Sequence, residues 1–303
     1  MARVLISGSS GLIGSTLVPK LQEAGHEVIR LVRGPVHSAS EISWNPEAGQ
    51  VDRATLEGCD AVVHLAGYNI AARRWNEEVK AIIRNSRVQS TRLLAEALAS
   101  CSAKPRVFAS ASAVGYYGHR GAEELTEDSP PGNDFLAQVC QEWETATQAA
   151  AEAGIRVVNC RLGVVLSDRG GALAKMRLPF LLCLGGKIGS GDQYWSWIHI
   201  HDAVKAFQFV LEQEGLRGPV NFTSPQPVTN AEFTRTLGRV LRRPTIFPMP
   251  AFAARLVFGE MADALFLSSA RVVPKKLRDH GFTFDYPELE SALRHLLQRP
   301  AAG

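Results

Sequence analysis

Three glycines near the start of the chain have a spacing that suits the binding of a dinucleotide. They follow a short apolar run, Arg3 to Ser7, and precede an amphipathic stretch that reaches about Ala24. Glycine lets the backbone approach a pyrophosphate, and the free N–H groups at the start of a helix can bind it. We therefore predict a cofactor-binding turn, and not a purely structural one, formed by Gly8, Ser9, Ser10, Gly11, Leu12, Ile13 and Gly14.

A second apolar run, from Glu27 to Val32, is followed by Arg33. An NAD-preferring site usually has Asp or Glu at this distance, about 20 residues after the glycines, to bind the ribose hydroxyls. No acidic residue occurs between Glu27 and Glu41. Since a guanidinium is a planar cationic donor that suits a 2′-phosphate, Arg33 favours NADP(H) over NAD(H), unless it is simply a surface arginine at a strand end.

These residues must be positioned by alternating strands and helices. Further apolar runs of the buried-strand type cover 59–67, 106–115 and 154–166, and helical patterns cover 76–98 and 132–144. Ala66 and Gly67, which end the first of these runs, are small enough for a cofactor to lie close to the backbone. The alternation predicts an α/β fold with a doubly wound parallel sheet, a Rossmann fold.

The regular pattern loosens after about residue 167. We expect a dinucleotide-binding Rossmann domain over 1–167 and a smaller C-terminal, substrate-side subdomain over 168–303 whose pieces are interspersed with the sheet. Period-2 alternation suggests a strand that places Trp195, Trp197, His199 and His201 on one side, followed by a helix capped by Asp202. His199 is either a general acid or a hydrogen-bonded structural histidine.

Composition narrows the class of protein. A net charge of +3 and the scattered arginines give little support for nucleic acid or a membrane surface as a partner. No apolar run approaches the roughly 20 residues of a membrane span. The five cysteines form no CxxC pair, so neither disulfides nor a metal site is expected. With no signal segment recognised, we expect a cytoplasmic protein, a monomer or homodimer, that acts on a small molecule.

Several long motifs extend this prediction to a family. They are the glycine turn, HLAG (64–67), SASAVGYYG (110–118), TEDSP (126–130) and WIHIHD (197–202). With these motifs the chain resembles an extended short-chain dehydrogenase/reductase of the NAD-dependent epimerase/dehydratase type. More narrowly, AGYNIAARRWNEEVKAIIRNSRVQST (66–91), LGGKIGSGDQYWSWIHIHD (184–202) and VVPKKLRDHGFTFDYPELESAL (272–293) resemble an atypical SulA-like epimerase subfamily with a C-terminal DUF1731-type segment.

The resemblance implies a particular chemistry. Enzymes of this family move a hydride to or from nicotinamide while a tyrosine transfers a hydroxyl proton, and a lysine four residues later supports that tyrosine. Ser112 matches the family serine that positions the substrate oxygen, and Ala113 and Val114 stand where dehydratases have acidic residues. The resemblance also places Leu65, Ser110, Leu162 and Val165 at the cofactor.

The tyrosine and lysine of the family are absent. In one register they fall on Phe135 and Val139, and in the next on Leu136 and Cys140. None of the eight lysines has a tyrosine four residues before it. Arg87 stands where the family has a supporting asparagine. Three chemical groups are therefore missing together, which indicates a rebuilt site.

Other residues are candidates to replace these groups. Arg87 could bind the cofactor ribose or phosphate, unless it is a surface arginine of an exposed helix face. Tyr116 and Tyr117 follow Ser112 closely, so either could donate a proton, or both could be packing residues. With Phe135 and Val139 in the catalytic positions, the helix over 132–144 is expected to form an apolar wall beside the nicotinamide.

Two functions remain open from the sequence. The first is an NADP-dependent oxidoreductase or epimerase with a non-standard proton donor and a small polar or nucleotide-linked substrate. It is suggested by the intact glycine turn and by Ser112. The second is a non-catalytic NADP(H)-binding sensor that signals to a partner through its C-terminal block, which the loss of three chemical groups suggests.

Overall fold

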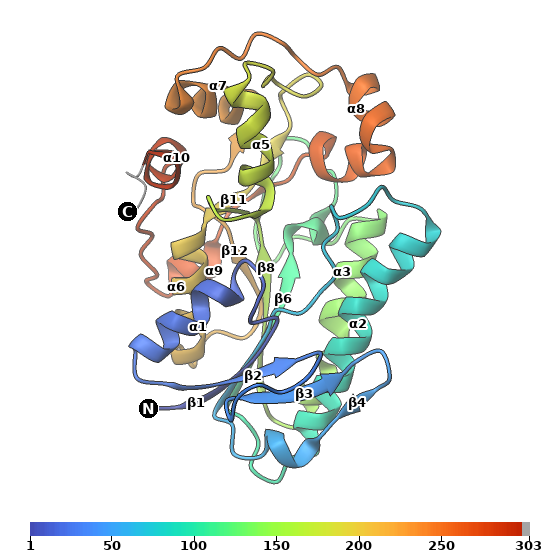
Figure 1. Cartoon of the computed structure of the whole chain (residues 1–303), viewed down its shortest axis with the longest axis vertical. Coiled ribbons are helices and arrows are strands. Elements are labelled where there is room, and N and C mark those ends of the chain that lie inside the picture. Colours follow the sequence, from blue (N-terminus) through green and yellow to red (C-terminus); the bar gives the residue numbers. More distant parts are fainter. Residues whose placement is uncertain (299–303) are drawn as a thin grey trace. The chain divides into compact units, whose positions relative to one another are not determined.

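The computed structural model describes residues 1–298 and divides them into two compact units (Figure 1). Unit 1 consists of residues 1–116, 138–161 and 204–220. Unit 2 consists of residues 117–137, 162–203 and 221 onward. Neither unit is continuous in sequence, because the chain passes between them several times.

An eight-stranded sheet forms the centre of unit 1. Its strands, in spatial order, are β12 (Gly218–Phe222), β8 (Arg156–Leu162), β6 (Val107–Ala113), β5 (Ala61–His64), β1 (Arg3–Ser7), β2 (Glu27–Val32), β3 (Glu41–Asn45) and β4 (Gln50–Val51). Parallel pairing joins β3 to β2, β2 to β1, β1 to β5 and β5 to β6, whereas β3 and β4 form an antiparallel pair. The chain order therefore reverses beside β1, and the predicted doubly wound parallel sheet is confirmed. Such a reversal creates a ligand-binding crevice at the carboxyl ends of the strands.

Five helices belong wholly or mainly to unit 1. They are α1 (Gly14–Glu23), α2 (Glu77–Ala99), α3 (Phe135–Thr145), α4 (Gln148–Glu152) and α6 (Ile200–Glu212), with short 3₁₀ turns η1 (Arg53–Leu56) and η2 (Val114–Tyr117). Helix α2 begins at an N-cap, Asn76, whose side chain accepts a hydrogen bond from the Val79 N–H at 2.8 Å. Glu77 and Glu78 in its first turn complement the helix dipole, so the start of α2 is fixed by local chemistry.

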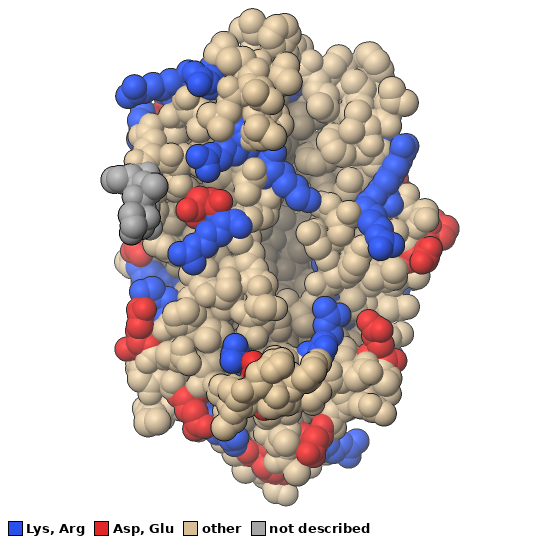
Figure 2. Space-filling model, viewed as in Figure 1, with Lys and Arg blue, Asp and Glu red and all other residues tan. Residues whose placement is uncertain are grey.

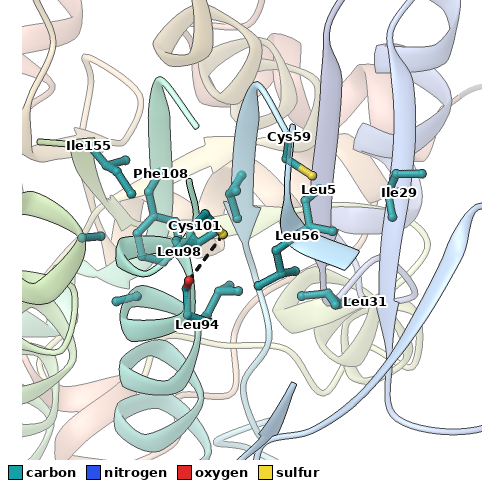
Figure 3. Packing of buried hydrophobic residues seen from close by; sticks show 14 of the residues in the cluster. Leu5, Ile29, Leu31, Leu56, Cys59, Leu94, Leu98, Cys101, Phe108 and Ile155 are labelled. Atoms are coloured by element: carbon teal, nitrogen blue, oxygen red, sulfur yellow. Dashed lines mark hydrogen bonds between the residues drawn. The ribbon is translucent and has the colours of Figure 1, made fainter. Parts of the chain in front are cut away.

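The core of unit 1 packs the sheet against α2 and α4. Leu5 and Phe108 from the sheet meet Leu94 and Leu98 of α2, and all four are fully buried (Figure 3). Burying a side chain of this size stabilises the fold by about 1.5–3 kcal/mol. The packing therefore holds the strands rigidly, and with them the loops at their carboxyl ends.

Unit 2 has smaller sheets and more irregular connections. Its strands pair as β9 (Val164–Leu166) with β11 (Trp197–His199), β10 (Tyr194–Trp195) with β13 (Val228–Thr229), and β7 (Glu124–Leu125) with β14 (Arg271–Val272). Its helices are α5 (Gly171–Leu181), α7 (Asn230–Leu241), α8 (Ala251–Phe258), a π-helical turn η3 (Ala262–Leu267), α9 (Lys275–Asp279) and α10 (Leu289–Leu297). Helix α7 has Thr229 as its N-cap, and the Thr229 hydroxyl accepts a hydrogen bond from the Glu232 N–H.

Three expectations about local structure were wrong: an unbroken strand over 154–166, the alternation through His201 and the helix cap at Asp202. The strand predicted over 154–166 is interrupted at Gly163, whose N–H donates to the Phe222 carbonyl and where a Cβ would lie 2.7 Å from the Ser196 oxygen. The alternation expected through His201 stops at His199, since α6 begins at Ile200. Asp202 therefore lies inside the first turn of α6, and its carboxylate accepts from the N–H groups of Asp285 and Tyr286.

Charged side chains are distributed over the surface. Figure 2 shows Lys and Arg scattered across one face, with Asp and Glu among them over much of it. Within residues 1–298, no helix combines the length and the apolar character that a membrane crossing requires.

Candidate functional site

The glycine turn connects β1 to α1 and is shaped by backbone contacts. Gly8 has a φ of +71°, and a Cβ there would lie 2.8 Å from the Leu65 carbonyl carbon. A Cβ on Gly14 would lie 2.3 Å from the Gly8 oxygen, so a larger residue would push α1 away from β1. The Gly11 N–H donates to the Gly8 oxygen at 3.0 Å, which closes the turn. Glycine is required here because the backbone segments touch.

The N-terminus of α1 fits a phosphate group. Its N-cap residue, Ile13, provides no side-chain hydrogen bond, and the first turn has no acidic residue. Ser10 and Gly11, in the middle of the turn, are exposed. Because the first N–H groups of a helix attract anions and no side chain competes for them, residues 8–14 form a cradle suited to a diphosphate.

Arg33 lies directly after β2, whose last residues pair with the end of β1 and with β3. Its side chain is exposed, and within residues 1–298 it makes no hydrogen bond or ion pair. The nearby carboxylate, Glu41, is held by Arg30 at 2.9 Å and by the His37 N–H. Arg33 is therefore available at the carboxyl edge of the sheet to bind a phosphate.

The next strand, β5, ends in a buried hydrogen-bonded histidine. The Nδ1 of His64 lies 2.6 Å from the Ser7 hydroxyl, and Nε2 lies 3.2 Å from the Ser90 hydroxyl. Burial lowers the pKa of His64 to about 3, so the ring is neutral and structural. The hydrogen bond from the Leu65 N–H to the Ser7 carbonyl, 3.1 Å long, holds residues 65–67 beside the glycine turn.

A polar network lies at the carboxyl end of β6. The Ser112 hydroxyl donates to the Glu144 carboxylate at 2.7 Å. Arg161 binds both oxygens of the same carboxylate, at 2.8 and 2.9 Å. The Arg161 guanidinium carbon lies 3.4 Å from the centre of the Tyr116 ring. We call these four residues the Ser112 network, and all of them belong to unit 1.

The members of the Ser112 network differ in exposure. Ser112 is 1% exposed, and the side chains of Arg161 and Glu144 are 3% and 12% exposed. Tyr116 is only half-buried. Since a buried charged group needs a partner, the two-point contact joins Glu144 and Arg161 in a buried pair. Tyr116 is the member of the network best placed to meet a ligand.

Helix α3 includes most of the stretch in which the tyrosine and lysine are missing. Val139 and Cys140 are both buried, and Phe135 and Leu136 are half-buried. Burial, with a smaller contribution from the Glu144 carboxylate, raises the pKa of the Cys140 thiol to about 12. The thiol is therefore neutral, and neither predicted register supplies an acid or base from these residues.

Arg87 lies close to the position that the lysine would occupy. Its guanidinium donates to the carbonyls of Tyr68 and Ile83, both at 3.0 Å, and lies 5.1 Å from the centre of the Trp143 ring. The positive charge of Arg87 lowers the pKa of the Cys140 thiol, against the rise caused by burial, so the two side chains are near each other. A Cβ on Gly67 would lie 3.5 Å from its guanidinium carbon. Arg87 is therefore not a surface arginine.

The other predicted site residues lie in different surroundings. Tyr117 is fully buried in unit 2, where its hydroxyl donates to the Asn221 side-chain oxygen at 2.7 Å. Leu162 and Val165 also belong to unit 2 and are half-buried. Ser110 is fully buried in β6, paired with His64. The structure thus brings the glycine turn, residues 65–67, Arg87 and Ser112 into one unit.

A histidine cluster in unit 2 is held by directed hydrogen bonds. The His201 N–H donates to the Nδ1 of His199 at 3.0 Å, so the proton of a neutral His199 is on Nε2. That Nε2 lies 3.1 Å from the Nδ1 of His295, and Tyr286 stacks on the His199 ring at 3.9 Å. Nitrogens of His199, His201 and His295 all lie within 4.8 Å of one another, as in a metal site. These hydrogen bonds use nitrogen lone pairs that a metal would need. Both ring nitrogens of His199 are engaged within the protein, which favours a structural role over that of a general acid.

Sequence reasoning missed Glu144 and Arg161. Glu144 follows Cys140 by four residues, one turn farther along the helix face that carries the lost lysine position. Arg161 is a charged residue within the apolar run 154–166. A charge inside a buried strand requires a partner, and this was the signal that could have identified the pair.

The chain is similar to known proteins over nearly its whole length. The family model of the NAD dependent epimerase/dehydratase family matches residues 4–222, and that of a domain of unknown function, DUF1731, matches residues 249–296. The epimerase family protein MT2273 of Mycobacterium tuberculosis is 46% identical over 299 residues, which is 99% of each chain. The epimerase family protein SDR39U1 of Homo sapiens is 38% identical and covers 97% of this chain and 99% of its own.

Solved structures show the same relationship. The crystal structure of human SDR39U1 (isoform 2) with NADPH has a TM-score of 0.91 at 36% identity, covering 98% of this chain and 100% of that one. The nucleoside-diphosphate sugar epimerase from Corynebacterium glutamicum has a TM-score of 0.81 at 39% identity. This match covers 98% of the present chain but 58% of the Corynebacterium chain.

Proposed function

The chain belongs to the NAD dependent epimerase/dehydratase family, and from this premise we propose that it is an NADP(H)-dependent oxidoreductase or epimerase. Its substrate class is a small polar or nucleotide-linked molecule. The observation that carries the proposal is the Ser112 network at the carboxyl end of β6, in the same unit as the glycine turn. Members of this family are NAD dependent. The Ser112 network provides polar groups in place of the missing tyrosine and lysine.

Residues of unit 1 fit the cofactor. The uncapped start of α1 and the exposed middle of the glycine turn suit a diphosphate, and Arg33 suits the 2′-phosphate. The human relative that was crystallised with NADPH supports the choice of NADP(H). The bound nicotinamide would donate or accept the hydride.

Tyr116 is our candidate for the group that exchanges a proton with the substrate. It is half-buried, whereas the hydroxyl of Tyr117 is buried and donates to Asn221. The Arg161 guanidinium on the ring face fixes the ring orientation, and its positive charge favours negative charge that develops on the phenol oxygen. Glu144 balances part of that charge, so this assistance is smaller than that of an unpaired cation.

Ser112 and Glu144 position the reacting groups. The Ser112 hydroxyl donates a hydrogen bond to Glu144, which leaves the lone pairs of the serine oxygen to accept a hydrogen bond from a substrate hydroxyl. Arg161 fixes the carboxylate through two hydrogen bonds. Arg87, beside Cys140, provides a cation close to the lost lysine position.

Turnover measurements test the proposal. Purified protein would be incubated with NADPH or NADP⁺ and a panel of carbonyl compounds, alcohols and nucleotide sugars. Nicotinamide absorbance would be followed in both directions, and epimers would be separated by chromatography. We expect turnover that Tyr116→Phe lowers by about 10²–10⁴-fold, the usual contribution of a general acid or base. Loss of turnover in Tyr117→Phe with full activity in Tyr116→Phe would refute the assignment of the proton donor.

A second candidate function is a sensor that binds NADP(H) without turnover. It is favoured by one observation, the absence of any Tyr-x-x-x-Lys sequence in the chain. NADPH binding without turnover on the whole panel would support the sensor. Turnover that disappears in Ser112→Ala while NADPH binding persists would exclude it.

A further inference from the structure

Unit 2 exposes many large apolar side chains. The end of α5 and the residues after it expose Leu178, Leu182 and Leu184 by 59–64%. The segment before α8 exposes Ile246 and Phe247, and α8 itself exposes Phe252, Leu256 and Val257, by 57–74%. Single exposed apolar residues are ordinary, but a group of this size usually marks a binding surface.

The two segments are neighbours although about 60 residues separate them in sequence. The Met249 N–H donates to the Lys187 carbonyl at 2.8 Å, and the Gly189 N–H donates to the Met249 carbonyl at 2.9 Å. Gly186 packs so closely on the Phe247 backbone that a Cβ would overlap it. The backbones of residues 186–189 and 247–249 are therefore adjacent, and we call the exposed apolar side chains of the two segments the α5–α8 face.

The charges of these segments all have one sign. Residues 171–191 and 233–259 contain no Asp or Glu. They contain eight basic residues, Lys175, Arg177, Lys187, Arg235, Arg239, Arg242, Arg243 and Arg255. Among residues 1–298, Arg239 pairs with Glu290 and Arg255 pairs with Asp263, both acidic residues of other segments. In the part of Figure 2 that shows α5, α7 and α8, blue and tan atoms predominate.

We propose that the α5–α8 face binds the surface of a lipid bilayer that contains anionic lipids. Exposed Leu, Ile, Val and Phe side chains can enter the boundary between headgroups and acyl chains, while Lys and Arg around them bind anionic headgroups. The charge complementarity selects this partner over a second copy of the chain. In a two-fold dimer the same face meets itself, so arginines would oppose arginines.

This inference concerns binding at the membrane surface, not insertion. It is consistent with the absence of a membrane-spanning helix among residues 1–298. It runs against the expectation of no membrane partner, which used the net charge of +3 for the whole chain. That sum averages the basic segments with acidic residues elsewhere.

Vesicle sedimentation tests the proposal on the full chain without cofactor. One vesicle preparation is phosphatidylcholine alone, and the other is an equimolar mixture of phosphatidylcholine and phosphatidylglycerol. We expect at least tenfold tighter binding to the mixture, weakened by added salt. The double variant Phe252→Ser/Leu256→Ser should lose at least tenfold in affinity for the mixture. The matched control is Val36→Ser, which alters a 49% exposed apolar residue of unit 1 and should bind like the wild type.

A second pair of variants tests the charges. Arg177→Gln/Arg242→Gln should weaken binding to the mixture, and Lys104→Gln/Arg53→Gln, which removes exposed charges of unit 1, should not. No binding to the mixture, or equal binding to both vesicles, overturns the proposal. The proposal is also overturned if sedimentation velocity shows that the wild type is a dimer and that Phe252→Ser/Leu256→Ser is a monomer. If a variant fails to fold, the comparison of the two vesicles with wild-type protein still decides.

Discussion

The substitution Glu144→Gln should destabilise the protein strongly, because the Glu144 carboxylate and the Arg161 guanidinium form a buried ion pair. Glutamine keeps the size of the side chain but removes the charge that holds the Arg161 guanidinium through two hydrogen bonds. The two side chains are 12% and 3% exposed, so water cannot replace the lost partner. Removing one member of a buried pair costs about 3–5 kcal/mol. Since the glutamine oxygen can still accept one hydrogen bond, we expect about 3 kcal/mol.

The assay is urea unfolding followed by circular dichroism. The matched control is Glu142→Gln on the same helix, because Glu142 faces Arg84 at 3.4 Å in an exposed pair, which should cost at most about 1 kcal/mol. The double variant Glu144→Leu/Arg161→Met should be more stable than Glu144→Gln, since it leaves no unpaired buried charge. A loss below about 1 kcal/mol for Glu144→Gln would refute our description of the Ser112 network as buried and charged.

Three further predictions concern the fold around the site. The pKa of His64 is depressed from 6.5 to about 3, so below pH 6.5 the unfolded chain binds a proton that the folded chain does not. The free energy of unfolding should therefore fall with falling pH by up to about 1.4 kcal/mol per pH unit. Urea unfolding should show a smaller slope for His64→Gln than for the wild type. Gly14→Ala should abolish NADPH binding in a fluorescence titration, because its Cβ would lie 2.3 Å from the Gly8 oxygen; unchanged binding would show that the turn tolerates the shift. Tyr117→Phe should lower the free energy of unfolding by about 1–3 kcal/mol, because the buried Asn221 oxygen loses its donor, and a smaller loss in urea unfolding would mean that water takes its place.

Local chemistry made much of the fold predictable. The glycine turn and the apolar runs depend on residues that are close in sequence, and the structure has a turn before a helix and strands at these places. The position of Arg33 directly after a strand was predictable in the same way, because it depends only on where β2 ends. The break at Gly163 was not predictable, since it results from contacts with Ser196 and Phe222, far along the chain.

The candidate site was predictable only in part. The absence of tyrosine and lysine can be counted in the sequence, and Ser112 was identified from its motif. Its partner Glu144 is 32 residues away, and Arg161 is 17 residues beyond Glu144. Which charged residues meet depends on how α3 packs beside the sheet, and that is a tertiary contact. For the same reason the sequence could not distinguish Tyr116, beside Arg161, from Tyr117, beside Asn221.

The most direct test of an NADP(H)-dependent function is a calorimetric titration of the protein with NADPH and with NADH, repeated on Arg33→Ala. We predict tighter binding of NADPH to the wild type. A charge-assisted hydrogen bond contributes about 1.5–3 kcal/mol, which corresponds to a preference of roughly 10–100-fold. Arg33→Ala should lose this preference and leave NADH binding nearly unchanged. Equal affinities of the wild type for the two cofactors, or a preference that survives in Arg33→Ala, would contradict the account.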